Sequence, residues 1–291
     1  MTTRNDTETK EVAPALKPGR RWRALVAVQR GGDRLPFFCV HGAGGNVLNF
    51  RGLSRAMRRS QPFFGLQARG VDGTSRPHGS IEEMARAYLS EVLDVQPTGP
   101  YLLGGYSGGG IVAFEMAQLL TAAGRRVALL SLIDTRHPHL PVPSVTMFTR
   151  VARLRDEGLR YILRGFQRQW HRMGEARDRL LLERRLARGE PIPFALRDMH
   201  LVGNFRDAVG RYQPNPWPGR ATLFRATDVG YANKEYRSAH GWDRHVLGGV
   251  EVVVVPGDHQ SLLLGMNADL LGRSLGAAIE RAQVGGGEHG H

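Results

Sequence analysis

Short apolar runs alternate along the chain with segments whose apolar residues recur at the helical period. The runs predict strands at residues 24–28, 36–40, 62–66, 101–106, 127–133, 221–225 and 250–255. The periodic segments predict helices at about 49–59, 80–95, 110–123 and 261–281. Because continuous apolar strands separated by helices are typical of a parallel sheet covered on both faces, the pattern predicts an α/β fold with a mostly parallel central sheet.

The alternation stops over residues 138 to about 205, where three prolines introduce a long arginine-rich helical stretch. Between Arg150 and Arg188 this stretch holds twelve arginines and five acidic residues. We expect a helical lid insertion here, which is either a solvated helical arm or a face that docks a partner. The polar residues 1–22 and the glycine-rich residues 284–291 are expected to be a flexible leader and tail around one domain at 23–283.

The composition is that of one large domain. The 291 residues are 41% hydrophobic, which is enough for a full core plus an insertion. No apolar run reaches the length of about 18 residues that a membrane span requires, and the first 20 residues lack the apolar segment of a signal peptide. We therefore expect a soluble, cytoplasmic protein with no membrane partner. The single cysteine, Cys39, excludes an internal disulfide and is expected at a buried strand position.

The formal net charge is +13, which raises nucleic acid as a partner. However, only three of the 40 basic residues are lysines, and no nucleic-acid-binding motif accompanies them. An arginine excess of this kind also follows from codon composition alone. The charge therefore favours an acidic protein or a phosphate-bearing partner over nucleic acid.

The sequence Gly-Tyr-Ser-Gly-Gly at residues 105–109 lies between a predicted strand and a predicted helix. In this setting G-x-S-x-G predicts a nucleophile elbow, in which the serine occupies a strained turn and its neighbours two residues away must lack bulk. Gly105 and Gly109 meet that requirement. Ser107 is therefore the predicted nucleophile, and the N-terminus of the following helix favours negative charge beside it.

A nucleophilic serine requires a base and a carboxylate that orients the base. Among eleven histidines, His259 follows the last predicted strand in a Pro-Gly-Asp-His turn, so it is expected at the same sheet edge as Ser107. Two aspartates that follow strands, Asp134 and Asp228, both fit the carboxylate role in the order serine, aspartate, histidine. Asp258 adjoins the histidine and is expected to shape the turn.

The loop His-Gly-Ala-Gly-Gly at residues 41–45 also follows a predicted strand. Its glycines allow the backbone to approach a substrate, so the N–H groups of Ala43 and Gly108 are the expected oxyanion-hole pair. His41 is expected to organise this loop rather than to act as a base.

With these parts assembled, the chain resembles the thioesterase domains that end nonribosomal peptide synthetases and some polyketide synthases, from about residue 24 to residue 282. The matching segments are 37–46, 62–70, 104–110, 132–135, 218–226 and 256–259. The resemblance implies the α/β-hydrolase fold and favours Asp134 over Asp228. At Gly108 the chain departs from the many relatives with phenylalanine or alanine there; the backbone donor survives, but the side-chain packing must differ.

The resemblance also implies a substrate, namely an acyl or peptidyl chain held as a thioester on the phosphopantetheine arm of a carrier protein, with no metal and no cofactor of its own. The expected reaction is chain release through an acyl-serine, by hydrolysis or macrocyclisation, beneath a lid that shapes the acyl cavity. No carrier or condensation domain precedes the segment, so we expect it to act in trans or to derive from a larger synthase. The alternatives are a free-standing esterase or editing thioesterase, and a non-catalytic module that binds carrier proteins.

Overall fold

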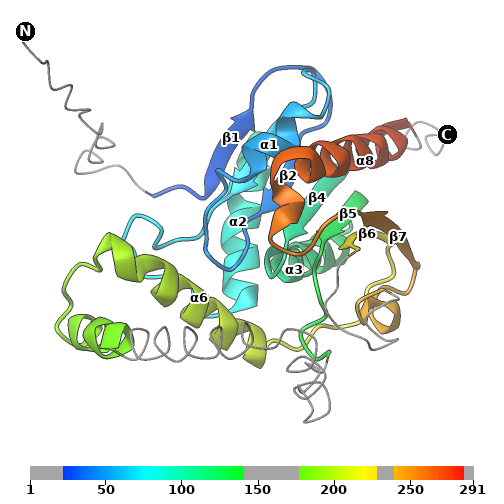
Figure 1. The fold of residues 1–291 in the computed structure, drawn as a ribbon. Helices are drawn as coiled ribbons and strands as arrows, with labels where there is room; N and C mark the ends of the chain where they lie inside the picture. The colour runs from blue at the N-terminus through cyan, green and yellow to red at the C-terminus, as the bar shows by residue number, and fades with distance from the viewer. Residues whose placement is uncertain (1–21, 141–176, 228–238, 285–291) are drawn as a thin grey trace, which may run out of the picture.

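The chain forms one twisted sheet with helices on both faces (Figure 1). The structure, a computed structural model, describes residues 22–140, 177–227 and 239–284. The sheet order is β1-β3-β2-β4-β5-β6-β7, and only β1 is antiparallel to its neighbour. The strands are β1 (Leu25–Gln29), β2 (Phe37–Val40), β3 (Phe63–Leu66), β4 (Tyr101–Tyr106), β5 (Val127–Ile133), β6 (Ala221–Ala226) and β7 (Val250–Val255).

The helices that cover the sheet separate into two layers. They are α1 (Phe50–Arg55), α2 (Ile81–Val95), α3 (Gly109–Ala122), α6 (Phe194–Arg211) and α8 (Gly265–Val284), with short 3₁₀ turns at Trp242–Arg244 and Ser261–Leu263. Helices α2 and α3 contribute to one buried cluster, and α1 and α8 contribute to another. The predicted α/β architecture with a mostly parallel sheet covered on both faces is therefore confirmed.

Strand β2 shows why the sheet requires both layers. Phe38 and Val40 belong to the cluster beneath α2 and α3, while Phe37 and Cys39 belong to the cluster beneath α1 and α8. All four side chains are buried, which is the pattern of a central strand apolar on both faces. Cys39 is fully buried within β2, so the prediction of a buried strand position is confirmed, and this burial raises the pKa of its thiol.

Parallel pairing brings distant segments to one edge of the sheet. Strands β2, β4, β5, β6 and β7 all run in the same direction, so the loops that follow them emerge together at their carboxyl ends. In open α/β sheets this edge is where ligands bind. Ser107, Asp134 and His259 follow the carboxyl ends of β4, β5 and β7 and therefore lie at this edge.

Three helix boundaries differ from the predicted ones. Helix α1 has only six residues of the expected 49–59, and the last predicted helix begins as the 3₁₀ turn Ser261–Leu263, with α8 starting at Gly265. Helix α6 continues to Arg211, past the expected end of the insertion near 205, because its second half packs on the main core through Phe205 and Ala208. Tyr212, just beyond it, donates to Glu115 of α3.

Several expectations fall on residues outside the described ranges. They are the leader up to residue 21, the first part of the insertion at 141–176, the second candidate carboxylate Asp228, and the tail from 285. Of the predicted lid, residues 138–140 and 177–205 are described, and the second range contains a helical segment at 177–187 and the first two-thirds of α6.

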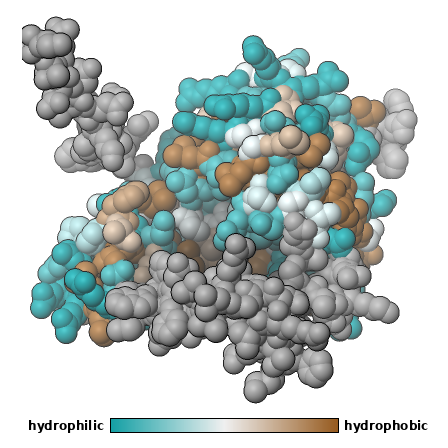
Figure 2. All heavy atoms as spheres, in the orientation of Figure 1, coloured by the Kyte–Doolittle hydropathy of each residue, from teal (hydrophilic) through white to brown (hydrophobic). Residues whose placement is uncertain are grey.

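The described surface is mixed in character. Figure 2 shows apolar residues interspersed among polar ones across the face that carries α1 and α8. Leu264, just before α8, and Met266, in its first turn, are well exposed. Over the ranges that the structure describes, no helix combines the length and apolar character that crossing a membrane requires.

Candidate active site

Ser107 lies on a sharp turn between β4 and α3. Its φ angle is +55°, a left-handed conformation that residues other than glycine rarely adopt. The turn is fixed by the Ser107 N–H, which donates to the Ile133 carbonyl of β5 at 2.8 Å, and by the Gly110 N–H, which donates to the Ser107 carbonyl at 3.2 Å. The serine hydroxyl is therefore presented by a strained backbone that its neighbours hold in place.

The glycines on either side of the turn are required by backbone contacts. A Cβ atom at Gly105 would lie 2.2 Å from the Gly109 carbonyl oxygen, and one at Gly109 would lie 2.1 Å from the His41 carbonyl oxygen. These distances are far below van der Waals contact, and the atoms concerned belong to the backbone, which cannot rotate away. The sequence argument for small residues two positions away from Ser107 therefore has its physical cause in this packing.

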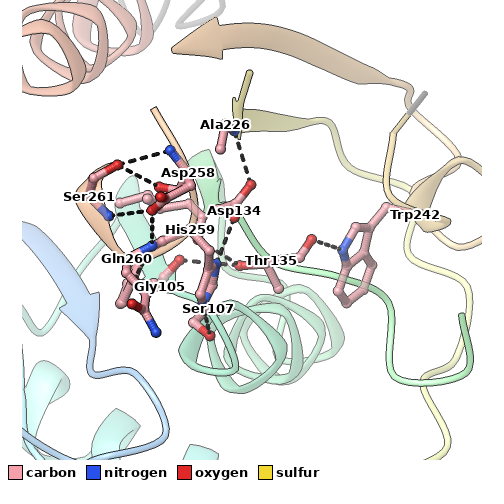
Figure 3. Close-up of polar contacts among 12 residues, drawn as sticks. Gly105, Ser107, Asp134, Thr135, Ala226, Trp242, Asp258, His259, Gln260 and Ser261 are labelled. Carbon is pink, nitrogen blue, oxygen red and sulfur yellow. Dashed lines mark hydrogen bonds and ion pairs between the residues drawn. The ribbon is translucent and has the colours of Figure 1, made fainter. Parts of the chain in front are cut away.

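His259 joins Ser107 to Asp134 (Figure 3). Its Nε2 lies 3.0 Å from Ser107 Oγ, and its Nδ1 lies 2.6 Å from Asp134 Oδ2. The histidine follows β7 in the turn at residues 256–259, and its side chain is 48% exposed. The three residues come from the ends of β4, β5 and β7, separated by as many as 152 positions in the sequence.

Asp134 is the buried end of this series. Its second carboxylate oxygen accepts the Ala226 N–H of β6 at 3.0 Å, while its own N–H donates to the Phe224 carbonyl at 2.7 Å. Burial by itself would raise the pKa of Asp134, but the hydrogen bonds from His259 and the Ala226 N–H outweigh it and hold the pKa below its usual value. Asp134 is therefore ionised at neutral pH.

The ionised carboxylate determines the tautomer of the histidine. A carboxylate only accepts hydrogen bonds, so Nδ1 of His259 must carry the proton that points to Asp134. In a neutral imidazole Nε2 is then the unprotonated nitrogen, and its lone pair faces the Ser107 hydroxyl. This arrangement can remove a proton from the serine.

Asp258 shapes the turn next to the histidine, as the sequence predicts. Its Oδ1 accepts the N–H groups of Gln260 at 2.9 Å and Ser261 at 2.8 Å, and its own N–H donates to Ser261 Oγ. None of these contacts involves the imidazole (Figure 3). The other aspartate considered from the sequence, Asp228, lies outside the described residues, so Asp134 is the carboxylate that the structure joins to His259.

The loop at residues 41–45 packs directly against the elbow. His41 is 1% exposed; its Nε2 is 2.8 Å from the Tyr88 hydroxyl and its Nδ1 is 2.5 Å from the Gly42 carbonyl. Burial, the largest cause, lowers the pKa of His41 to about 4, so its ring is neutral. It organises the loop, as expected, and makes no contact with Ser107.

The two N–H groups predicted to form an oxyanion hole have no acceptor among the described residues. Neither Ala43 nor Gly108 donates a hydrogen bond there, although both are only partly exposed. Backbone donors left free in a semi-enclosed position are uncommon, because an unpaired buried N–H costs free energy. Both donors are therefore available to a ligand.

Helix α6 makes contacts with the site that no pattern in the sequence predicts. A Cβ at Gly108 would lie 2.3 Å from Cε1 of Phe205, and one at Gly45 would lie 3.2 Å from Leu201. The Phe205 ring thus fills the space into which a side chain at position 108 would project. The unusual glycine after the serine and the aromatic residue almost a hundred positions later form one packing unit, and no local pattern links them.

The described residues also include possible metal ligands. Within residues 22–140, 177–227 and 239–284, no group of three or more histidine, cysteine, aspartate or glutamate side chains is arranged to hold a metal ion.

The comparisons with known proteins agree with this fold. The mostly parallel sheet with its strand-turn-helix serine is the α/β-hydrolase fold. The family described as "Thioesterase domain" matches residues 35–273. The chain belongs to this thioesterase-domain family, whose reaction is the hydrolysis of thioesters.

The relatives are much larger proteins. The chain is 31% identical over 252 residues to malpinin synthetase of Mortierella alpina, which covers 85% of this chain but 3% of the synthetase. It is 39% identical over 139 residues to indigoidine synthase of Dickeya dadantii (strain 3937), which covers 48% of this chain and 9% of that protein. The chain therefore spans only a small part of the length of these relatives.

Solved structures share the fold. The holo form of the four-domain nonribosomal peptide synthetase AB3403, bound to AMP and glycine, matches with a TM-score of 0.64 at 25% identity, over 87% of this chain and 20% of that one. The RedJ thioesterase from the prodiginine pathway of Streptomyces coelicolor matches with a TM-score of 0.60 at 22% identity, over 93% and 97% of the two chains.

The packing around Gly109 generates a stability prediction. Gly109→Ala forces a methyl group onto the His41 carbonyl, so we expect a loss of about 1–3 kcal/mol or more in the free energy of unfolding, measured by urea denaturation. Gly203→Ala is the matched control, because Gly203 lies in α6 with no atom within 4 Å of its added Cβ, and it should be neutral or stabilising. Equal effects of the two substitutions would contradict the steric argument.

The contact between Gly108 and Phe205 predicts energetic coupling. Gly108→Ala should destabilise the protein because the new methyl group meets the buried aromatic ring. In a Phe205→Leu background, which opens this space, the same change should cost less, with a coupling energy of about 0.5–3 kcal/mol in a double-mutant cycle. Strict additivity of the two unfolding free energies would show that the ring does not restrict position 108.

Proposed function

We propose that this chain is a serine thioesterase that releases an acyl or peptidyl chain from the phosphopantetheine thioester of a carrier protein through an acyl-serine intermediate, in nonribosomal peptide or polyketide biosynthesis. The observation that carries the proposal is the continuous hydrogen-bonded series Ser107–His259–Asp134 on a strained elbow. Membership of the thioesterase-domain family supports the class of bond attacked. The synthetases among its relatives support the kind of substrate.

The geometry supports a defined sequence of proton transfers. Nε2 of His259 takes the hydroxyl proton as Ser107 Oγ forms a bond to the thioester carbonyl carbon, and Asp134 stabilises the imidazolium that results. The carbon–sulfur bond then breaks, and His259 returns the proton to the departing thiolate. An acyl-serine and a free phosphopantetheine thiol remain.

The carbonyl oxygen of the acyl chain becomes negatively charged when Ser107 attacks the thioester, and again when the acyl-serine is attacked by the second nucleophile. The N–H groups of Ala43 and Gly108 are the donors we assign to this charge, because each is free within the described residues and each lies beside the elbow. The N-terminus of α3, which begins at Gly109, adds the favourable end of its helix dipole.

The acyl-serine is resolved by a second nucleophile. With water the product is a free acid, and with a hydroxyl or amine of the bound chain it is a ring. Which nucleophile wins depends on how far the pocket excludes water and positions the internal group. We assign that control to the lid insertion at residues 138–205, of which α6 contacts the loop at 41–45 and the elbow.

The partner we propose is an acyl or peptidyl carrier protein. The formal net charge of +13 suits an acidic or phosphate-bearing partner, and a phosphopantetheine arm carries a phosphate. This chain matches 20% of the length of AB3403, a four-domain nonribosomal peptide synthetase, which supports a role within such a synthetase. No cofactor of the chain's own is needed for this chemistry.

Replacement of the nucleophile provides the first functional test. Ser107→Ala should abolish the covalent adduct seen by intact mass after incubation with an acyl thioester, and should lower turnover by roughly 10³-fold or more. Asp134→Ala should lower turnover by roughly 10³- to 10⁴-fold while leaving Ser107 in place. Asp258→Ala is the matched control, because this carboxylate contacts only the turn.

Two results would contradict these roles. An adduct that persists on Ser107→Ala would mean that another residue is acylated. A larger loss of turnover from Asp228→Ala than from Asp134→Ala would transfer the carboxylate role to Asp228.

The substrate class is tested by comparing leaving groups. An acyl chain presented on a phosphopantetheinylated carrier protein should be turned over with a higher kcat/KM than the same chain as a free oxygen ester, since remote binding energy from the carrier supports the chemical step. A preference for the oxygen ester would favour an esterase. Failure of a fluorophosphonate to label the wild-type protein would favour a non-catalytic carrier-binding module.

A further inference from the structure

Tyr106 contacts three separate parts of the candidate site. It is the last residue of β4 and precedes Ser107. Its ring lies against the loop that follows β2, because a Cβ at Gly42 would be 3.0 Å from Tyr106 Cδ1. It also contacts His259 through both its ring and its hydroxyl. No part of the elbow motif requires an aromatic residue at this position, so these contacts need a separate explanation.

The ring of Tyr106 stacks on the imidazole of His259. The two ring centroids are 5.3 Å apart and the ring planes differ by 16°. A near-parallel aromatic neighbour restricts rotation of the imidazole out of its plane, which is the plane containing both Nδ1 and Nε2. The stack therefore fixes the direction of both hydrogen bonds that link Ser107 to Asp134.

The hydroxyl of Tyr106 fixes the backbone that carries the imidazole. It donates to the His259 carbonyl at 2.5 Å. Burial, followed by the charges of Asp134 and Asp258, raises the pKa of Tyr106 to about 12, so the hydroxyl retains its proton and remains a donor throughout the neutral range.

His259 needs such support more than its two partners do. Ser107 is held within the elbow and Asp134 is 7% exposed, whereas the His259 side chain is 48% exposed and projects from a surface turn. That turn is closed mainly by Asp258 and by the hydrogen bond from the Gly257 N–H to Thr227 Oγ1. Neither contact reaches the imidazole ring.

We propose that Tyr106 is a positioning residue for His259: its hydroxyl holds the histidine backbone, and its ring holds the imidazole plane and stabilises the imidazolium formed during the reaction. This inference rests on the proposed function. The face of an aromatic ring carries negative charge density and attracts a cation within about 6 Å of its centroid. The imidazolium of His259 would meet that face on one side while Asp134 accepts its Nδ1–H in the ring plane.

Among the residues that the structure describes, four side chains that can titrate or donate and accept protons lie around His259. Asp134 faces it from β5, Ser107 from the elbow and Tyr106 from β4, while Asp258 adjoins it in the turn. The buried His240 interacts electrostatically with Asp134. Of these groups, Tyr106 alone combines contact with the flat face of the imidazole and a neutral side chain, so its removal changes the environment of the imidazolium without adding or deleting a charge.

The experiment uses two substitutions at Tyr106 and one control. Tyr106→Phe keeps the stacked ring and removes the hydroxyl, and Tyr106→Leu removes both. Tyr101→Phe is the matched control, because Tyr101 lies on the same strand and its hydroxyl bonds the Pro97 carbonyl and Arg125, away from the site. Each variant is assayed for kcat and KM with an acyl N-acetylcysteamine thioester across pH, and its folding is checked by thermal unfolding.

We expect a graded loss of kcat at unchanged KM. Tyr106→Phe should lower kcat about three- to tenfold, the equivalent of one hydrogen bond, and Tyr106→Leu about 10- to 100-fold. Because the ring and the hydroxyl act on the orientation of His259 and not on substrate binding, the loss should fall on kcat and leave KM within twofold, and Tyr106→Phe should retain the part of kcat that depends on the stacked ring.

Contrary results are distinguishable from failure of the proposed function. If the wild-type protein turns over the thioester but both variants keep kcat within twofold of Tyr101→Phe, or if their losses fall on KM and not on kcat, the inference is overturned and the proposed function stands. If Tyr106→Leu does not fold, a kcat for Tyr106→Phe equal to that of the control overturns the inference. Absence of thioester turnover in the wild-type protein would instead refute the proposed function.

Discussion

The close packing of backbone on backbone at the elbow is the constraint on which the rest of the site depends. Gly105 and Gly109 pack against backbone atoms at distances that leave no room for a Cβ, and this packing holds Ser107 at a φ of +55°. The contact of Gly109 with the His41 carbonyl also fixes the loop at 41–45 relative to the serine. One steric arrangement thus places Ser107 beside the proposed oxyanion donors, and the surrounding packing compensates for the strain of the turn.

The charge of Asp134 determines the hydrogen-bonding state of His259. Asp134 is buried yet ionised, because the Ala226 N–H and His259 compensate for its lost hydration. An ionised acceptor at that point leaves one neutral tautomer of His259 compatible with the structure, with its basic nitrogen toward Ser107. The strand ends do this positioning: β5 carries the carboxylate, β6 donates to it, and β7 delivers the histidine. The relative positions of Ser107, Asp134 and His259 are therefore determined by the parallel sheet.

The parts of this molecule that sequence predicts well are those encoded locally. Strand runs and the glycine spacing around Ser107 are local, so the sheet and the elbow were predictable, and strand direction alone brings residues 107, 134 and 259 to one edge. From the residues themselves, Asp134 and Asp228 were equivalent, because each follows a strand. The contact of Asp134 with His259 depends on how three strand ends meet in space, which no local pattern encodes. The continuation of α6 to Arg211 and the contact of Phe205 with Gly108 were likewise beyond reach, since both depend on packing between distant segments.

That last contact bears on how a lid can influence chemistry in this fold. Phe205 is buried against Gly108, and Leu201 approaches Gly45, so one helix contacts the elbow and the loop at 41–45 at the same time. The second half of α6 is anchored in the main core through Ala208, whereas Phe194 in its first turn is largely exposed. Leu201 and Phe205 are both buried and lie in different halves of α6, so the helix is coupled to the loop at 41–45 and to the elbow through two side chains. A glycine at position 108 makes this coupling tight, because no side chain of its own separates the elbow from the helix.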